Sequence, residues 1–154
     1  MGIALTLKQY LDDQHINYEV MTHARTSSSS STAAAGHVSG DDFAKAVVLK
    51  RDGGYFMVVI PATRHVALSE VSHRLNEPVG LATEEEIDRL FPDCETGAVP
   101  PIASAYGLTA IVDECLEGRT DIYCEAGDHR SLLHMSGDDF RRLTMGMPFG
   151  AFSR

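Results

Sequence analysis

The chain has 154 residues, of which 44% are hydrophobic, and a formal net charge of −9 at pH 7. This length suits one domain with a sizeable core, and the acidic surplus argues against a DNA-binding protein that neutralises a long stretch of backbone phosphates. No stretch approaches the roughly 18 consecutive apolar residues of a membrane span, so we expect no membrane partner. Three cysteines do not form a disulfide framework, so we expect a cytoplasmic protein. The cysteines, Cys94, Cys115 and Cys124, lack C-x-x-C spacing, so no metal or cofactor is expected.

The N-terminal third predicts a helix, a strand and a second, shorter helix. Apolar residues recur at helical spacing over residues 5–13, and residues 17–21 are typical of a strand. The serine run 27–31 predicts a loop that supplies the N-cap of a helix over 33–35, which Gly36 ends.

The middle of the chain predicts a β-hairpin. Two apolar, β-branched runs, residues 44–50 and 55–60, flank the compact turn Asp52-Gly53-Gly54. Further on, Thr83 and Glu86 have the spacing of a capping box, which marks the start of a helix.

The remaining segments are two helices, three strands and a final helix: residues 68–75, 84–90, 108–112, 121–125, 130–135 and 138–143. Strands and short helices that follow one another without regular alternation are typical of an α+β domain. We expect residues 1–144 to form this single domain and residues 145–154 to form a C-terminal tail.

Lys45 is the one charged residue within the apolar strand expected over residues 44–50. A charged group among such neighbours is costly unless something pairs with it. It is either a structural lysine whose stem packs while its ammonium reaches the surface, or a fixed cation that orients an oxygen-rich ligand.

Two loops carry the other candidate residues. The segment Gly97-Ala98-Val99-Pro100-Pro101 combines a conformationally free glycine with two prolines that lack N–H donors. Its small residues would let a ligand approach the backbone, although a rigid turn has the same composition. The segment Gly127-Asp128-His129 holds a histidine, which near neutral pH can act as acid, base or hydrogen-bond donor, although a polar surface turn explains it equally. No G-x-S-x-G nucleophile motif or phosphate-binding glycine motif occurs.

The order of several short segments along the chain is distinctive. They are Tyr18-Glu19-Val20, His23, Lys45-Ala46-Val47-Val48-Leu49, Val58-Val59-Ile60-Pro61, residues 97–101, Asp113 and Gly127-Asp128-His129. Over roughly residues 7–143, this order resembles the YbaK family, the prolyl-tRNA-synthetase-associated editing domains that act as freestanding aminoacyl-tRNA deacylases.

The resemblance implies an α+β fold with a mixed, partly closed β-sheet of about six to seven strands and surrounding short helices. It implies hydrolysis of the ester of a mischarged tRNA that carries a small amino acid of the alanine, serine, threonine or cysteine type. The implied partners are the tRNA acceptor end with its amino acid and an aminoacyl-tRNA synthetase. The implied catalytic residues are Lys45, Gly97 and His129, and the implied substrate-binding residues are His23, Ala98, Val99, Pro100, Pro101, Gly127 and Asp128.

Two alternatives remain open on the sequence. One is a non-catalytic module that binds tRNA or a synthetase and regulates it. The other is a hydrolase of a different small aminoacyl ester. An activated ester needs no protein nucleophile, because positioning and electrostatic stabilisation can suffice, so the lack of a catalytic triad does not separate these alternatives from a deacylase.

Overall fold

The computed structural model describes residues 2–26 and 28–154. The helices are α1 (Leu5–Asp13), α2 (Ser29–Ala35), α3 (Leu68–Leu75), α4 (Glu84–Leu90) and α5 (Gly137–Leu143), with 3₁₀ turns η1 (Ala103–Tyr106) and η2 (Glu114–Leu116). The strands are β1 (Tyr18–Thr22), β2 (Phe43–Arg51), β3 (Gly54–Pro61), β4 (Gly80–Leu81), β5 (Thr109–Asp113), β6 (Asp121–Glu125), β7 (Ser131–Ser136) and β8 (Phe149–Gly150).

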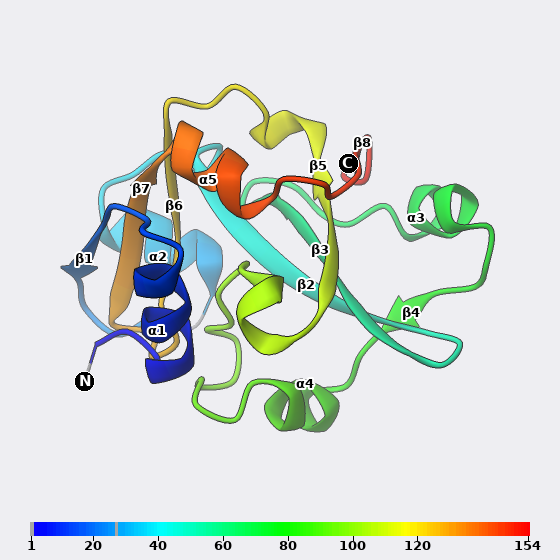
Figure 1. Cartoon of the computed structure of the whole chain (residues 1–154), viewed down its shortest axis with the longest axis horizontal. Helices are drawn as coiled ribbons and strands as arrows, with labels where there is room; N and C mark the ends of the chain where they lie inside the picture. Colours follow the sequence, from blue (N-terminus) through cyan, green and yellow to red (C-terminus); the bar gives the residue numbers. More distant parts are fainter. Residues whose placement is uncertain (1, 27) are drawn as a thin grey trace.

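All eight strands belong to one mixed sheet in the order β1-β7-β6-β2-β3-β5-β8, with β4 beside β2. The pairs β1–β7, β7–β6 and β2–β3 are antiparallel, whereas β2–β6, β3–β5 and β5–β8 are parallel. The predicted α+β class and mixed sheet are therefore confirmed. The hydrogen-bonded path is open and runs from β1 to β8 (Figure 1).

The two strands beyond the expected six are β4 and β8, each two residues long. Such short strands carry no readable alternation of apolar and polar residues. Their pairing partners, β2 and β5, lie far away in sequence. They form because the fold brings them to existing strands.

Helices cover both faces of the sheet, and each face has its own apolar cluster. Leu7 and Leu11 of α1 pack in the largest cluster on one face. On the other face, Ala33 of α2 packs with Phe43 of β2 and Leu132 of β7. Figure 1 shows α1 in front of the sheet and α2 behind it.

The serine run contributes to a helix, which corrects the expectation of a loop. Helix α2 begins at Ser29, within the run, and the Ser28 hydroxyl accepts a hydrogen bond from the Ser31 N–H at 3.1 Å. A serine N-cap satisfies a free N–H of the first turn, so further serines can follow it in helical conformation. Gly36 ends the helix as predicted, and Ser27 lies outside the described residues.

The C-terminal residues are fastened to the sheet through β8 and Asp113. The Asp113 Oδ2 accepts the Phe152 N–H at 3.0 Å, and the Phe152 ring is 2% exposed. The residue quoted above as a family marker thus joins the end of β5 to the chain terminus. In the described part of the chain, no helix has both the length and the apolarity needed to cross a membrane.

Candidate functional site

Lys45 lies near the start of β2, opposite Ile60 of β3, and is partly buried. Its Nζ donates to the Arg64 carbonyl at 3.0 Å, and none of the ion pairs among the described residues includes it. Burial lowers the pKa of this lysine. Because an ammonium has three N–H donors, Lys45 keeps donors for a ligand.

A buried carboxylate lies beside Lys45 on the neighbouring strand. The parallel pairing of β2 with β6 places Ala44 next to Cys124, and Lys45 and Glu125 directly follow this pair. Side chains alternate along a strand, and the preceding Phe43 packs in the α2-side cluster with β6 residues. Lys45 and Glu125 therefore belong to the sheet face that α2 covers.

Glu125 has an unusual environment for an acid. It is 1% exposed, and neither carboxylate oxygen has a hydrogen bond of standard geometry among the described residues, although the Thr32 hydroxyl is close enough to act on it. Burial raises its pKa to about 7, while the nearby Thr32 hydroxyl and His129 act in the opposite direction. The sequence predictions did not include Glu125. Glu125 could have been found by the same sequence signal as Lys45, which is a charged residue within an apolar strand.

The Gly127-Asp128-His129 turn follows β6 directly. The Asp128 Oδ1 accepts the N–H groups of Arg130 and Ser131 at 3.0 and 2.8 Å, which closes the turn. Gly127 has a φ of +116°, a backbone conformation that favours glycine. In the structure, Asp128 therefore stabilises the turn that presents His129.

His129 is 5% exposed and has a defined tautomer. Its Nε2 lies 2.5 Å from the Thr96 carbonyl oxygen, which can only accept, so Nε2 carries the hydrogen. The Nδ1 is buried and has no partner among the described residues. In the neutral ring, Nδ1 is therefore free to accept a hydrogen bond from a ligand.

The glycine-proline loop, residues 97–101, is hydrogen-bonded to this turn through Glu95. The Glu95 N–H donates to the Gly127 carbonyl at 2.7 Å, and the Ala98 N–H donates to the Glu95 carbonyl at 3.0 Å. Gly97 is exposed with a φ of +84°, whereas Ala98 and the two prolines at 100–101 are buried. Val99 is partly buried against the α1-side cluster. The loop's buried side chains fix its shape, and its backbone at Gly97 remains accessible.

His23 lies on the other side of the same turn. Its N–H donates to the Arg130 carbonyl at 2.8 Å, and the Thr26 N–H donates to the His129 carbonyl at 3.1 Å. The His23 Nδ1 contacts the Ala24 carbonyl at 2.6 Å, and its Nε2 is buried with no partner among the described residues. Hydrogen bonds thus join three of the predicted segments: His23, the glycine-proline loop and the turn.

A surface pocket of about 530 Å³ opens beside His129. Its lining residues are Arg25, Asp88, Pro92, Cys94, Glu95, Thr96 and His129. An ion pair of 2.5 Å joins Arg25 to Glu95 in this lining. Lys45 and Gly97 do not line the pocket, so the structure links Lys45 to the other site residues through Glu125 and the turn that follows it.

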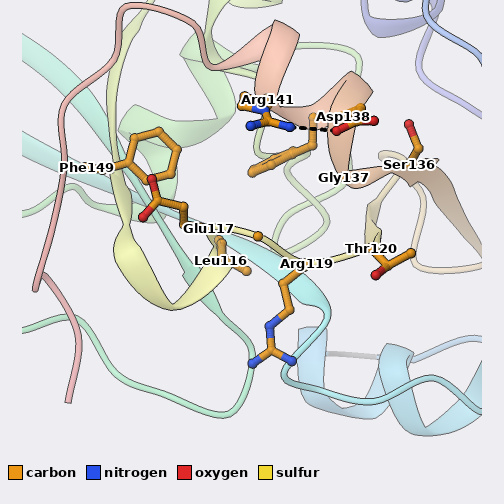
Figure 2. A pocket seen from close by; sticks show the side chains of 11 residues that line it. Leu116, Glu117, Arg119, Thr120, Ser136, Gly137, Asp138, Arg141 and Phe149 are labelled. Atoms are coloured by element: carbon orange, nitrogen blue, oxygen red, sulfur yellow. Dashed lines mark hydrogen bonds and ion pairs between the residues drawn. The ribbon is translucent and has the colours of Figure 1, made fainter.

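A second pocket, of about 420 Å³, lies away from these residues, between η2 and α5. Leu116, Phe140 and Phe149 contribute its apolar surface, and an ion pair of 2.7 Å between Arg141 and Asp138 lies within it (Figure 2). None of the predicted site residues lines it.

The thiols are poorly suited to nucleophilic catalysis. Burial raises the pKa of Cys94 to about 11 and also raises that of Cys124, and a hydrogen bond with Asp113 raises the pKa of Cys115. Reactive cysteines instead have lowered pKa values. Among the described residues, no three His, Cys, Asp or Glu side chains cluster so as to hold a metal ion.

The α+β domain thus has a candidate site near the turn that follows β6. The site contains a lysine, a buried acid and a histidine but no activated thiol, which suits it to binding and positioning a small polar ligand. The sequence profile of the aminoacyl-tRNA editing domain family matches residues 23–143. The chain belongs to this family, as the resemblance predicted.

Solved structures share the fold over nearly the whole chain. A hypothetical protein is 22% identical with a TM-score of 0.84, covering 97% of this chain and 99% of its own. A protein proposed as a trans-editing enzyme for prolyl-tRNA synthetase is 21% identical with a TM-score of 0.84, covering 98% and 96%. A protein of Marinobacter aquaeolei VT8, described as a candidate in signal transduction, is 18% identical with a TM-score of 0.78, and the match covers 97% of this chain and 30% of that one. No curated protein matches the chain.

Proposed function

We propose that this protein is a trans-editing aminoacyl-tRNA deacylase, which hydrolyses the ester between a tRNA and a wrongly attached small amino acid. The observation that carries the proposal comes from a member of the aminoacyl-tRNA editing family. Lys45 and Glu125, a cation and an acid that form no ion pair with each other, occupy neighbouring positions of β2 and β6, and His129 lies close to Glu125. Such a site has groups for both ends of a charged ester.

In the proposed mechanism, the protein positions the ester and stabilises charge. Lys45 donates to an oxygen of the terminal nucleotide or of the aminoacyl group, using the donors that Arg64 leaves free. The accessible backbone at Gly97 positions the ester and the attacking water, and the unpartnered His129 Nδ1 accepts a hydrogen bond near them. Preorganised groups of this kind stabilise a developing oxyanion without a protein nucleophile.

Close packing around the site favours a small amino acid. Phe43 and Leu132 are both 0% exposed and Ala33 is 3% exposed, on the same sheet face as Lys45 and Glu125. A close-packed apolar wall leaves little space for a large side chain. Alanine, serine, threonine and cysteine all remain within this class, since a hydrophobic wall discriminates only modestly among similar side chains.

The proposed substrate and the net charge of −9 are compatible. An editing domain needs to contact only the acceptor end of tRNA, so it does not need the large basic surface that a long stretch of phosphates requires. We propose that the protein acts in the cytoplasm on released aminoacyl-tRNA, with a synthetase as the partner that supplies it.

We predict that a mischarged tRNA ending in 2′-deoxyadenosine is a poor substrate. No described thiol is activated, and the proposed mechanism assigns no protein side chain as the base, so the neighbouring ribose hydroxyl is the group that would activate water. The rate of amino-acid release from the deoxy and normal tRNAs should differ on the order of 100-fold, as for loss of a general base. Equal rates would remove the ribose hydroxyl from the mechanism.

A deacylation panel tests the proposed function itself. The protein is incubated with tRNA carrying alanine, serine, threonine or cysteine, and with the free aminoacyl esters. Hydrolysis confined to the tRNA esters supports the proposal. Binding of tRNA without hydrolysis would instead identify a regulatory module, and hydrolysis of the free esters alone would identify a different esterase.

A further inference from the structure

Glu125 belongs to the candidate site, but the proposed mechanism gives its side chain no contact with the substrate. It is 1% exposed, and its carboxylate has no hydrogen bond of standard geometry among the described residues, although the Thr32 hydroxyl lies close enough to influence it. Buried polar groups in folded proteins are nearly always paired, and an exception calls for an explanation. A carboxylate held in this way is suited to a cationic group that arrives with a ligand.

The surroundings of Glu125 place this unsatisfied acid in the candidate site. The Thr32 hydroxyl, His129 and Asp128 are the polar groups that influence it, and Lys45 lies at the adjacent position of β2. Lys45 does not pair with it, since none of the ion pairs among the described residues includes either side chain. One strand position therefore offers an acid that forms no ion pair, and its neighbour offers a cation with unused donors.

An aminoacyl ester carries complementary groups close together. Its α-ammonium is separated from the ester carbonyl by a single carbon, and the nucleotide oxygens follow. We infer that Glu125 binds the free α-ammonium of the aminoacyl ester while Lys45 binds oxygen at the other end, so that the site selects esters whose amino group is unblocked. This inference rests on the proposed function.

Burial of Glu125 is consistent with such a role. Burial raises the pKa of Glu125 to about 7, so much of the carboxylate is protonated near neutral pH. An ammonium placed against it would favour the ionised form, and the proton would pass to solvent. Glu125 then becomes negatively charged only when the ammonium is present to pair with it.

The test compares blocked and unblocked substrates in three proteins: the wild type, Glu125→Gln and, as a control, Glu117→Gln. Glu117 is an exposed acid remote from the turn, so its substitution removes the same charge without touching the site. The substrates are tRNA carrying alanine and the same tRNA carrying N-acetylalanine. Steady-state rates give kcat and KM separately for each pair.

For the wild type, N-acetylation should lower kcat/KM on the order of 10- to 100-fold, the usual range for a hydrogen bond to a charged group. Glu125→Gln should lose a similar factor on the unblocked substrate, mainly in KM, and change the acetylated one by less than about threefold. Glu125→Asp, which retains the charge, should recover part of the loss. An equal loss of kcat on both substrates would overturn the inference and make Glu125 a general base, and no loss on either would leave it a structural residue.

Failure of the inference is distinguishable from failure of the proposed function. Stable amide analogues of the two substrates allow binding to be measured without hydrolysis. If the wild type hydrolyses the esters but binds both analogues equally, only the inference fails. If it hydrolyses none of the esters yet prefers the unblocked analogue, and Glu125→Gln abolishes that preference, then the deacylase proposal fails and the ammonium site stands.

Discussion

Replacing Lys45 by alanine should reduce kcat/KM for a mischarged tRNA on the order of 100- to 1,000-fold, the range for removing a preorganised donor to a developing oxyanion. Lys45 has no carboxylate partner among the described ion pairs, and among the described residues its hydrogen bond goes to the Arg64 carbonyl. Its substitution therefore breaks little within the protein. The loss should appear in deacylation rates measured with saturating and limiting tRNA.

Lys8→Ala is the matched control for this variant. Lys8 is exposed on α1, in an ion pair with Asp12 at 2.7 Å, and surface pairs of this kind contribute little to stability. Both variants should unfold within a few degrees of the wild type, and Lys8→Ala should retain full activity. Wild-type turnover by Lys45→Ala would exclude the role proposed for Lys45.

Replacing Glu125 by glutamine should stabilise the folded protein in alkaline solution. The pKa of Glu125 is raised from 4.5 to about 7 by burial. An acid with a raised pKa favours folding below its unfolded pKa, and this contribution is lost as the pH rises through the folded value. The amide is neutral at every pH, so it avoids burial of the charge.

The free energy of unfolding should therefore be similar for the two proteins near pH 4.5. At about pH 8.5, it should be larger for Glu125→Gln by roughly 3 kcal/mol, since the pKa shift from 4.5 to about 7 corresponds to about 1.4 kcal/mol per unit. Thr32, His129, Asp128 and Lys45 surround the site in both proteins, so the difference isolates Glu125. Urea unfolding at the two pH values measures it, and a difference that does not vary with pH would show that the buried charge is not the cause.

Local sequence signals predicted most of the fold. The Thr83–Glu86 capping box and helix α4 occur as expected, and the Asp52-Gly53-Gly54 turn connects β2 to β3. The start of α2 inside the serine run was missed because serine is typical of both loops and helix N-termini. β4 and β8 were missed because their pairing depends on residues far away in sequence.

The site was predictable where a charge interrupts an apolar run, as at Lys45. Glu125 has the same signal, but it stands at the end of β6 next to a turn, where an exposed acid is the ordinary expectation. Its burial arises from the parallel pairing of β6 with β2 and from the cover of α2. Neither is readable from the local sequence, since parallel strands pair across long connections.

The most direct test of the deacylase proposal is a single-turnover measurement of amino-acid release from alanyl-tRNA, with the protein in excess over the tRNA. We predict release well above the spontaneous rate by the wild type and by Lys8→Ala, and a rate close to spontaneous for Lys45→Ala. Release at the spontaneous rate by the wild type from tRNAs carrying alanine, serine, threonine and cysteine, although they bind, would contradict the proposal.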